Sequence, residues 1–67
     1  MSKYELIKSY HSEINICKMK LRRSDYKAIK FAEGELTSDE YADIRIERRA
    51  LRAKINELEA KIEELKG

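Results

Sequence analysis

The apolar residues in the first half of the chain recur every three or four positions. A spacing of this kind places side chains on one face of a helix, so it predicts a helix over about residues 3–33. Ser24 and Asp25 interrupt the stripe and predict at most a kink. Gly34 suits the left-handed position that ends a helix, which predicts a turn over about 34–37. The stripe consists of Ile7, Tyr10, Ile14, Cys17, Leu21, Ala28 and Phe31.

A second helix is predicted to begin just after Thr37. Thr37 and Glu40 have the spacing of a capping box, and Leu36 and Tyr41 occupy the two positions of a hydrophobic staple. Acidic residues follow in the first turn, where the helix dipole favours negative charge. No glycine or proline intervenes until the end of the chain, so we expect this helix over about 38–66.

Two helices of similar length joined by about four residues predict an all-α fold. We expect an antiparallel, coiled-coil-like two-helix hairpin that forms one domain over residues 1–67. The alternative is that the two helices separate and pair with other chains.

The second helix carries a strict heptad repeat. Isoleucine at a with leucine at d favours a parallel two-stranded coil, although the stripe of the first helix could occupy the same seam. Two hairpins packed as a four-helix bundle would cover both stripes. A chain of this size has a small core and no disulfide or metal, so we expect self-association into a dimeric four-helix bundle or a higher oligomer, with a monomer as the alternative. The a and d residues of this predicted oligomerisation seam are Tyr41, Ile44, Arg48, Leu51, Ile55, Leu58, Ile62 and Leu65.

Arg48 is the charged residue of the seam, where a charge needs a partner. In a hairpin with its turn near position 35, facing residues have numbers that sum to about 71. Arg48 then faces Arg23 and Ser24, and Asp25 lies within one turn. We predict an Arg48–Asp25 ion pair, with the hydroxyl of Ser24 or Tyr26 as a candidate third partner.

Charge is unevenly distributed along the chain. Residues 1–33 hold eight basic and four acidic groups, whereas residues 34–67 hold seven and nine. Guanidinium groups match phosphate oxygens, so a basic band at mid-length could bind a nucleotide or a nucleic-acid strand. The alternative is two solvated helix faces with internal ion pairs to residues such as Asp43 and Glu47. The candidate anion-binding residues are Lys18, Arg22, Arg23, Arg49 and Arg52.

The remaining composition gives little support for catalysis or for a cofactor. The single cysteine, Cys17, lies on the apolar stripe and is expected to be a packing residue, and His11 flanks the stripe. One cysteine and one histidine exclude a zinc site and an intramolecular disulfide. No apolar run reaches the ~20 residues of a membrane span, and no apolar signal region follows Met1. We therefore expect a non-enzymatic protein without metal or cofactor, in the cytoplasm of a host cell or in a virion.

One segment has a recognisable pattern. The sequence SDYKAIKFAEG at 24–34 is followed by EYA at 40–42 and by Arg48, Arg52, Ile55, Asn56, Leu58 and Glu59. Over about residues 21–60 this resembles a helical-hairpin segment, DYKxIKxAEG…EEYA…R…R…INELE, of small phage and prophage proteins and of tail-associated proteins of Gram-positive bacteria.

The resemblance implies a phage or mobile-element origin and a hairpin that turns at Gly34. The function of those segments is mostly unknown. We expect an oligomerising adaptor that binds a host or phage protein, either in virion assembly or in inhibition of a host defence factor. The alternative is an anion-binding protein that captures a nucleotide or nucleic-acid strand.

Overall fold

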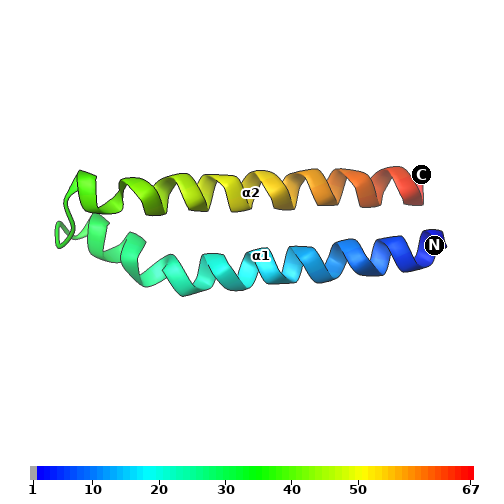
Figure 1. The fold of residues 1–67 in the computed structure, drawn as a ribbon, viewed down its shortest axis with the longest axis horizontal. Coiled ribbons are helices and arrows are strands. Elements are labelled where there is room, and N and C mark those ends of the chain that lie inside the picture. The colour runs from blue at the N-terminus through cyan, green and yellow to red at the C-terminus, as the bar shows by residue number, and fades with distance from the viewer. Residues whose placement is uncertain (1) are drawn as a thin grey trace.

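The computed structural model describes residues 2–67 as two antiparallel α helices (Figure 1). Helix α1 spans Lys3–Ala32 and helix α2 spans Ser38–Lys66, with no strand among the described residues. The two helices lie side by side, and both termini are at the end opposite the turn. The predicted all-α helical hairpin is confirmed, and the predicted helix bounds agree with the structure to within one residue.

Helix α1 continues without a break through Ser24. The hydroxyl of Ser24 donates to the carbonyl oxygen of Leu21 at 3.1 Å. Bonds of this kind compete with the helix ladder and often bend a helix. Figure 1 shows that α1 curves on its way to the turn, in agreement with a kink rather than a helix end.

The turn begins with Gly34 in the left-handed conformation, at φ +81°. The backbone N–H of Gly34 donates to the carbonyl of Phe31 at 3.1 Å, and that of Glu35 donates to the carbonyl of Lys30 at 2.8 Å. These two bonds form a Schellman motif, which satisfies the last carbonyl groups of α1. The predicted role of Gly34 is confirmed.

Thr37 and Glu40 form the predicted capping box at the start of α2. The Thr37 hydroxyl accepts from the Glu40 N–H at 3.1 Å, and the Glu40 carboxylate accepts from the Thr37 N–H at 3.0 Å. Hydrogen bonds with Thr37 hold the pKa of the Glu40 carboxyl below its usual value of 4.5. The bond from the Thr37 backbone N–H has the larger effect, and the bond with the Thr37 side chain has the smaller one. The cap therefore favours the ionised carboxylate.

The hydrophobic core between the helices is narrow. Leu58, which is 1% exposed, is its most completely buried side chain, and Cys17 is buried as predicted. The accessible surface of 5189 Å² exceeds the about 4,400 Å² expected for a compact monomer of this mass. One hairpin thus leaves more surface exposed than its mass requires. The buried apolar residues are Ile14, Cys17, Tyr41, Ile55, Leu58 and Ile62.

An aromatic stack closes the core at the turn. The rings of Phe31 and Tyr41 stack with centroids 4.5 Å apart and an angle of 11° between their planes. The guanidinium of Arg45 lies 5.2 Å from the Phe31 ring centroid and 5.6 Å from that of Tyr41. This stack joins the last turn of α1 to the first turn of α2, and the sequence pattern did not predict it.

Candidate functional site

The predicted oligomerisation seam faces α1 of the same chain. All four a residues are buried, and so is Leu58 at a d position. The other d residues, Ile44, Leu51 and Leu65, are only half-buried. A parallel partner cannot occupy this seam while the hairpin is closed. Any oligomer therefore has to form through residues that the closed hairpin leaves exposed. The a residues are Tyr41, Arg48, Ile55 and Ile62.

Arg48 forms the predicted ion pair with Asp25. Its guanidinium lies 2.9 Å from the Asp25 carboxylate, and it donates to the Ser24 hydroxyl at 2.7 Å. A third bond, to the carbonyl oxygen of Leu21 at 2.8 Å, was not predicted. Tyr26, the other candidate partner, is exposed and makes no such bond.

The Arg48 cluster is internally satisfied. Ser24 donates to the carbonyl of Leu21 while it accepts from Arg48, so its hydroxyl has both kinds of partner. Among residues 2–67, no buried side-chain polar atom lacks a hydrogen bond. Three acceptors take up the guanidinium of Arg48, a residue that is only 9% exposed, so Arg48 orders the hairpin and is not free to bind a ligand.

A depression near the termini shows which residues of the two helices share one side of the hairpin, and the predicted basic band can be located relative to it. That depression brings His11 of α1 together with Glu59 and Glu63 of α2. Lys18 follows His11 by one heptad, and Arg52 precedes Glu59 by one heptad. A heptad is close to two helical turns, so these residues lie on the same side of the hairpin.

Four of the five predicted anion-binding residues thus share one face at mid-length. Arg49 precedes Glu63 by two heptads, and Arg22 lies one turn beyond Lys18. We call this surface the basic face, defined by Lys18, Arg22, Arg49 and Arg52. Arg23 does not belong to it, because this residue lines a groove on the other side.

The cations of the basic face are exposed and unpaired within the described chain. The ion pairs among residues 2–67 are Arg48–Asp25 and, on the surface of α2, Lys61–Glu57 at 3.3 Å. Internal pairs with Asp43 and Glu47, the predicted alternative, are not formed. The basic face therefore presents four guanidinium or ammonium groups to solvent.

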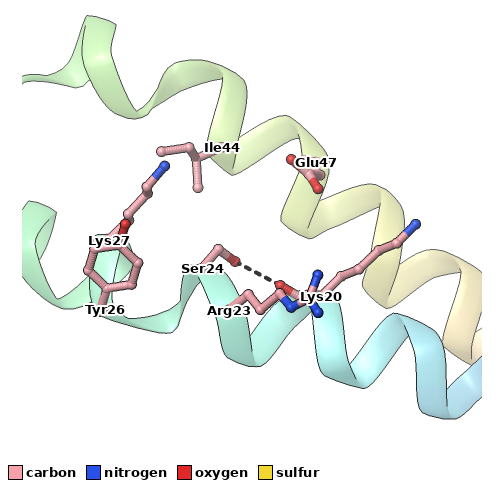
Figure 2. Close-up of a pocket in the computed structure, with 7 residues that line it drawn as sticks. All are labelled: Lys20, Arg23, Ser24, Tyr26, Lys27, Ile44 and Glu47. Carbon is pink, nitrogen blue, oxygen red and sulfur yellow. Dashed lines mark hydrogen bonds between the residues drawn. The ribbon is translucent and has the colours of Figure 1, made fainter.

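A shallow groove runs along the opposite side of the hairpin, toward the turn (Figure 2). A first part of 360 Å³ continues into a second part of 370 Å³, which shares Tyr26, Lys27 and Ile44 with it. We call the whole the Ile44 groove. Figure 2 shows Ile44 and Glu47 on the α2 side and the basic side chains on the α1 side. Its lining residues are Lys20, Arg23, Ser24, Tyr26, Lys27, Lys30, Leu36, Glu40, Ile44 and Glu47.

The two walls of the Ile44 groove carry opposite charge. The α1 wall has Lys20, Arg23, Lys27 and Lys30, whereas the α2 wall has Glu40 and Glu47. No ion pair joins the walls within the described residues. The sequence pattern did not predict this groove, although the apolar d position of Ile44, three residues before the acidic Glu47, could have indicated it.

The outer face of α1 carries exposed apolar side chains. Ile16, Met19, Tyr26 and Ile29 are between 44% and 58% exposed. Their spacing keeps them on the side of α1 away from the core, where Tyr26 also borders the Ile44 groove. They form a stripe that the hairpin itself does not cover, which we call the outer α1 stripe.

The described chain contains no cluster that could hold a metal ion: no three side chains of His, Cys, Asp or Glu come together among residues 2–67. Neither described helix is long and apolar enough to cross a membrane. Comparison of the chain with protein-family models, with curated proteins and with solved structures finds no match.

Proposed function

We propose that this protein is a small non-enzymatic helical adaptor that associates with itself and binds a protein partner. The outer α1 stripe is the observation that carries the proposal. Exposed large apolar side chains at helical spacing are typical of a surface that a partner helix covers. Basic residues such as Arg22 and Lys30 lie beside the stripe, and they favour a partner whose apolar face is flanked by carboxylates.

The phage-type role of such an adaptor rests on the resemblance of residues 21–60 alone. Virion assembly and inhibition of a host defence factor are the two roles that we propose on this basis. Both require binding and neither requires catalysis.

Partner capture with matched variants tests the proposal. Ile16→Glu combined with Met19→Glu places charge in the outer α1 stripe without touching a buried residue. Ile46→Glu is the control, because Ile46 is an isolated exposed residue of α2. We expect the wild type and the control to retain the same protein from a bacterial lysate at high salt, and the double variant to lose it. Capture that is the same for all three proteins, or no capture at all, would contradict docking through this stripe.

Anion binding is the second proposed function, and the basic face favours it. Four cations at one level without a carboxylate partner are suited to a phosphate backbone. If all four contact a single strand, affinity should fall about 50-fold between about 50 and 200 mM salt.

Fluorescence anisotropy with a labelled single-stranded oligonucleotide, with ATP as competitor, measures this directly. Arg22→Glu combined with Arg49→Glu should abolish binding and leave helicity unchanged. A wild type that does not bind at low salt would exclude this function, and so would binding that survives the double reversal.

A further inference from the structure

We infer that the Ile44 groove is the contact surface between two copies of this chain, packed groove to groove with their turns at the same end. This rests on the self-association proposed above and gives it a geometry. The observations that carry it are the unpaired walls, the half-buried d residues and the surplus surface of the single hairpin.

Two contacts between the helices show which residues of α1 and α2 lie opposite each other. Phe31 stacks on Tyr41, and Lys61 lies 5.7 Å from the ring centroid of Tyr10. Both pairs have numbers that sum to about 72. Lys27 is therefore level with position 45, between Asp43 and Glu47.

The charges of the two walls favour one orientation of the two-fold axis between the copies. A two-fold axis parallel to the hairpin places α1 of each copy over α2 of the other, at the same level. The basic wall of one copy then meets the acidic wall of the other, with Lys27 of the first near Asp43 and Glu47 of the second. A two-fold axis across the hairpin would instead put the two grooves at opposite ends, where neither wall meets its complement.

This arrangement also covers apolar side chains of α2 that a single hairpin leaves half-buried. Ile44, Leu51 and Leu65 form a row along α2, and each remains half-buried in one hairpin. Leu36 lines the groove near the turn. In the paired arrangement these side chains become the centre of a four-helix bundle in which every helix is antiparallel to its neighbours.

The area of one face of the hairpin is large enough for a specific interface. The hairpin has extents of 47 × 15 × 15 Å. One long face of this size is comparable to the about 800 Å² per partner that a specific interface buries. The surplus surface of the single hairpin is of the same order.

Charge reversal on one wall at a time tests the arrangement. Arg23→Glu with Lys27→Glu places carboxylates opposite Asp43 and Glu47 of the partner copy, and Asp43→Lys with Glu47→Lys places ammonium groups opposite Arg23 and Lys27 of the partner copy. Light scattering at ~100 µM should give twice 7.9 kDa for the wild type and 7.9 kDa for each double variant. An equimolar mixture of the two variants should regain the dimer, because the carboxylates introduced into one variant then face the ammonium groups introduced into the other. Native mass spectrometry should show the mixed species.

Controls separate this inference from loss of folding and from the proposed partner binding. Circular dichroism of each variant reports whether the helices persist. Arg49→Glu with Arg52→Glu reverses two charges on the basic face and should leave the dimer intact.

Three results would overturn the inference: a monomeric wild type, single-wall variants that remain dimers, or a mixture that stays monomeric. Each leaves the outer α1 stripe to be judged by the capture experiment, because that stripe and this groove are altered at different residues.

Discussion

Removing either partner of the Arg48–Asp25 pair should have unequal effects on stability. In Asp25→Ala, a nearly buried guanidinium loses one of its three acceptors. Breaking a fully buried ion pair costs about 3–5 kcal/mol. Here the Asp25 side chain is 52% exposed, so water can reach the freed N–H group. We expect a loss of about 1.5 kcal/mol, the low end for one hydrogen bond to a charged group.

Arg48→Leu should keep or raise the stability. Leucine can fill the space between the helices without the cost of desolvating a charge. The hydroxyl of Ser24 keeps its bond to the carbonyl of Leu21, and the carboxylate of Asp25 can be solvated. No buried polar group is left without a partner by this change.

Thermal unfolding followed by circular dichroism at fixed protein concentration measures both effects. A loss of 1.5 kcal/mol corresponds to a decrease in Tm of about 6–12 °C for a chain of this size. Asp25→Asn keeps an acceptor and should fall between wild type and Asp25→Ala. Two equally small changes would place Arg48 in solvent, and a large loss in Arg48→Leu would refute the argument that the ion pair is replaceable.

Three further predictions concern the core, the turn and the helix cap. Leu58→Ala should cost about 2–5 kcal/mol in unfolding free energy, whereas Lys61→Ala should change it by less than about 1 kcal/mol, because its ion pair is on the surface; equal melting of the two variants would contradict the core assignment. Gly34→Ala should cost about 1–2 kcal/mol in urea unfolding, because alanine is strained at φ +81°, and an unchanged midpoint would exclude that conformation. Thr37→Ala should lower stability by about 0.5–2 kcal/mol. Because the folded pKa of Glu40 is lowered, its contribution is present above pH 4.5 and lost as pH falls through the lowered pKa, so the wild type and Glu40→Ala should converge in Tm toward low pH.

The local features were the most predictable from sequence. Gly34, Thr37 and Glu40 act through residues within five positions of themselves, so a short stretch of sequence contains all the partners. The Arg48–Asp25 pair was also predictable, because the position of the turn determines which residues of a two-helix hairpin lie at the same level, and the apolar stripe and heptad seam determine which of them face inward. Once Gly34 sets that position, facing residues follow by counting.

The candidate sites were only partly predictable. The sequence predicted that the residues of the basic band lie at the same height along the hairpin. That height does not determine which side of its helix a residue occupies. The structure puts Arg23 in the Ile44 groove and leaves Arg22 with Arg49 on the basic face. Neighbours in sequence are about 100° apart around a helix, so two adjacent arginines can belong to different surfaces.

The sequence by itself determined the two helices, their ends and the residues that each can bury, because helical period and capping are local properties. Only the tertiary structure decided which surface covers the heptad seam of α2. It assigned α1 of the same chain to that seam, since a covalently attached helix is always present, whereas a second chain has to be bound at a cost in translational and rotational entropy. That choice leaves Ile44 half-buried between oppositely charged walls, a surface that depends on the packing of both helices and is not visible in either helix alone.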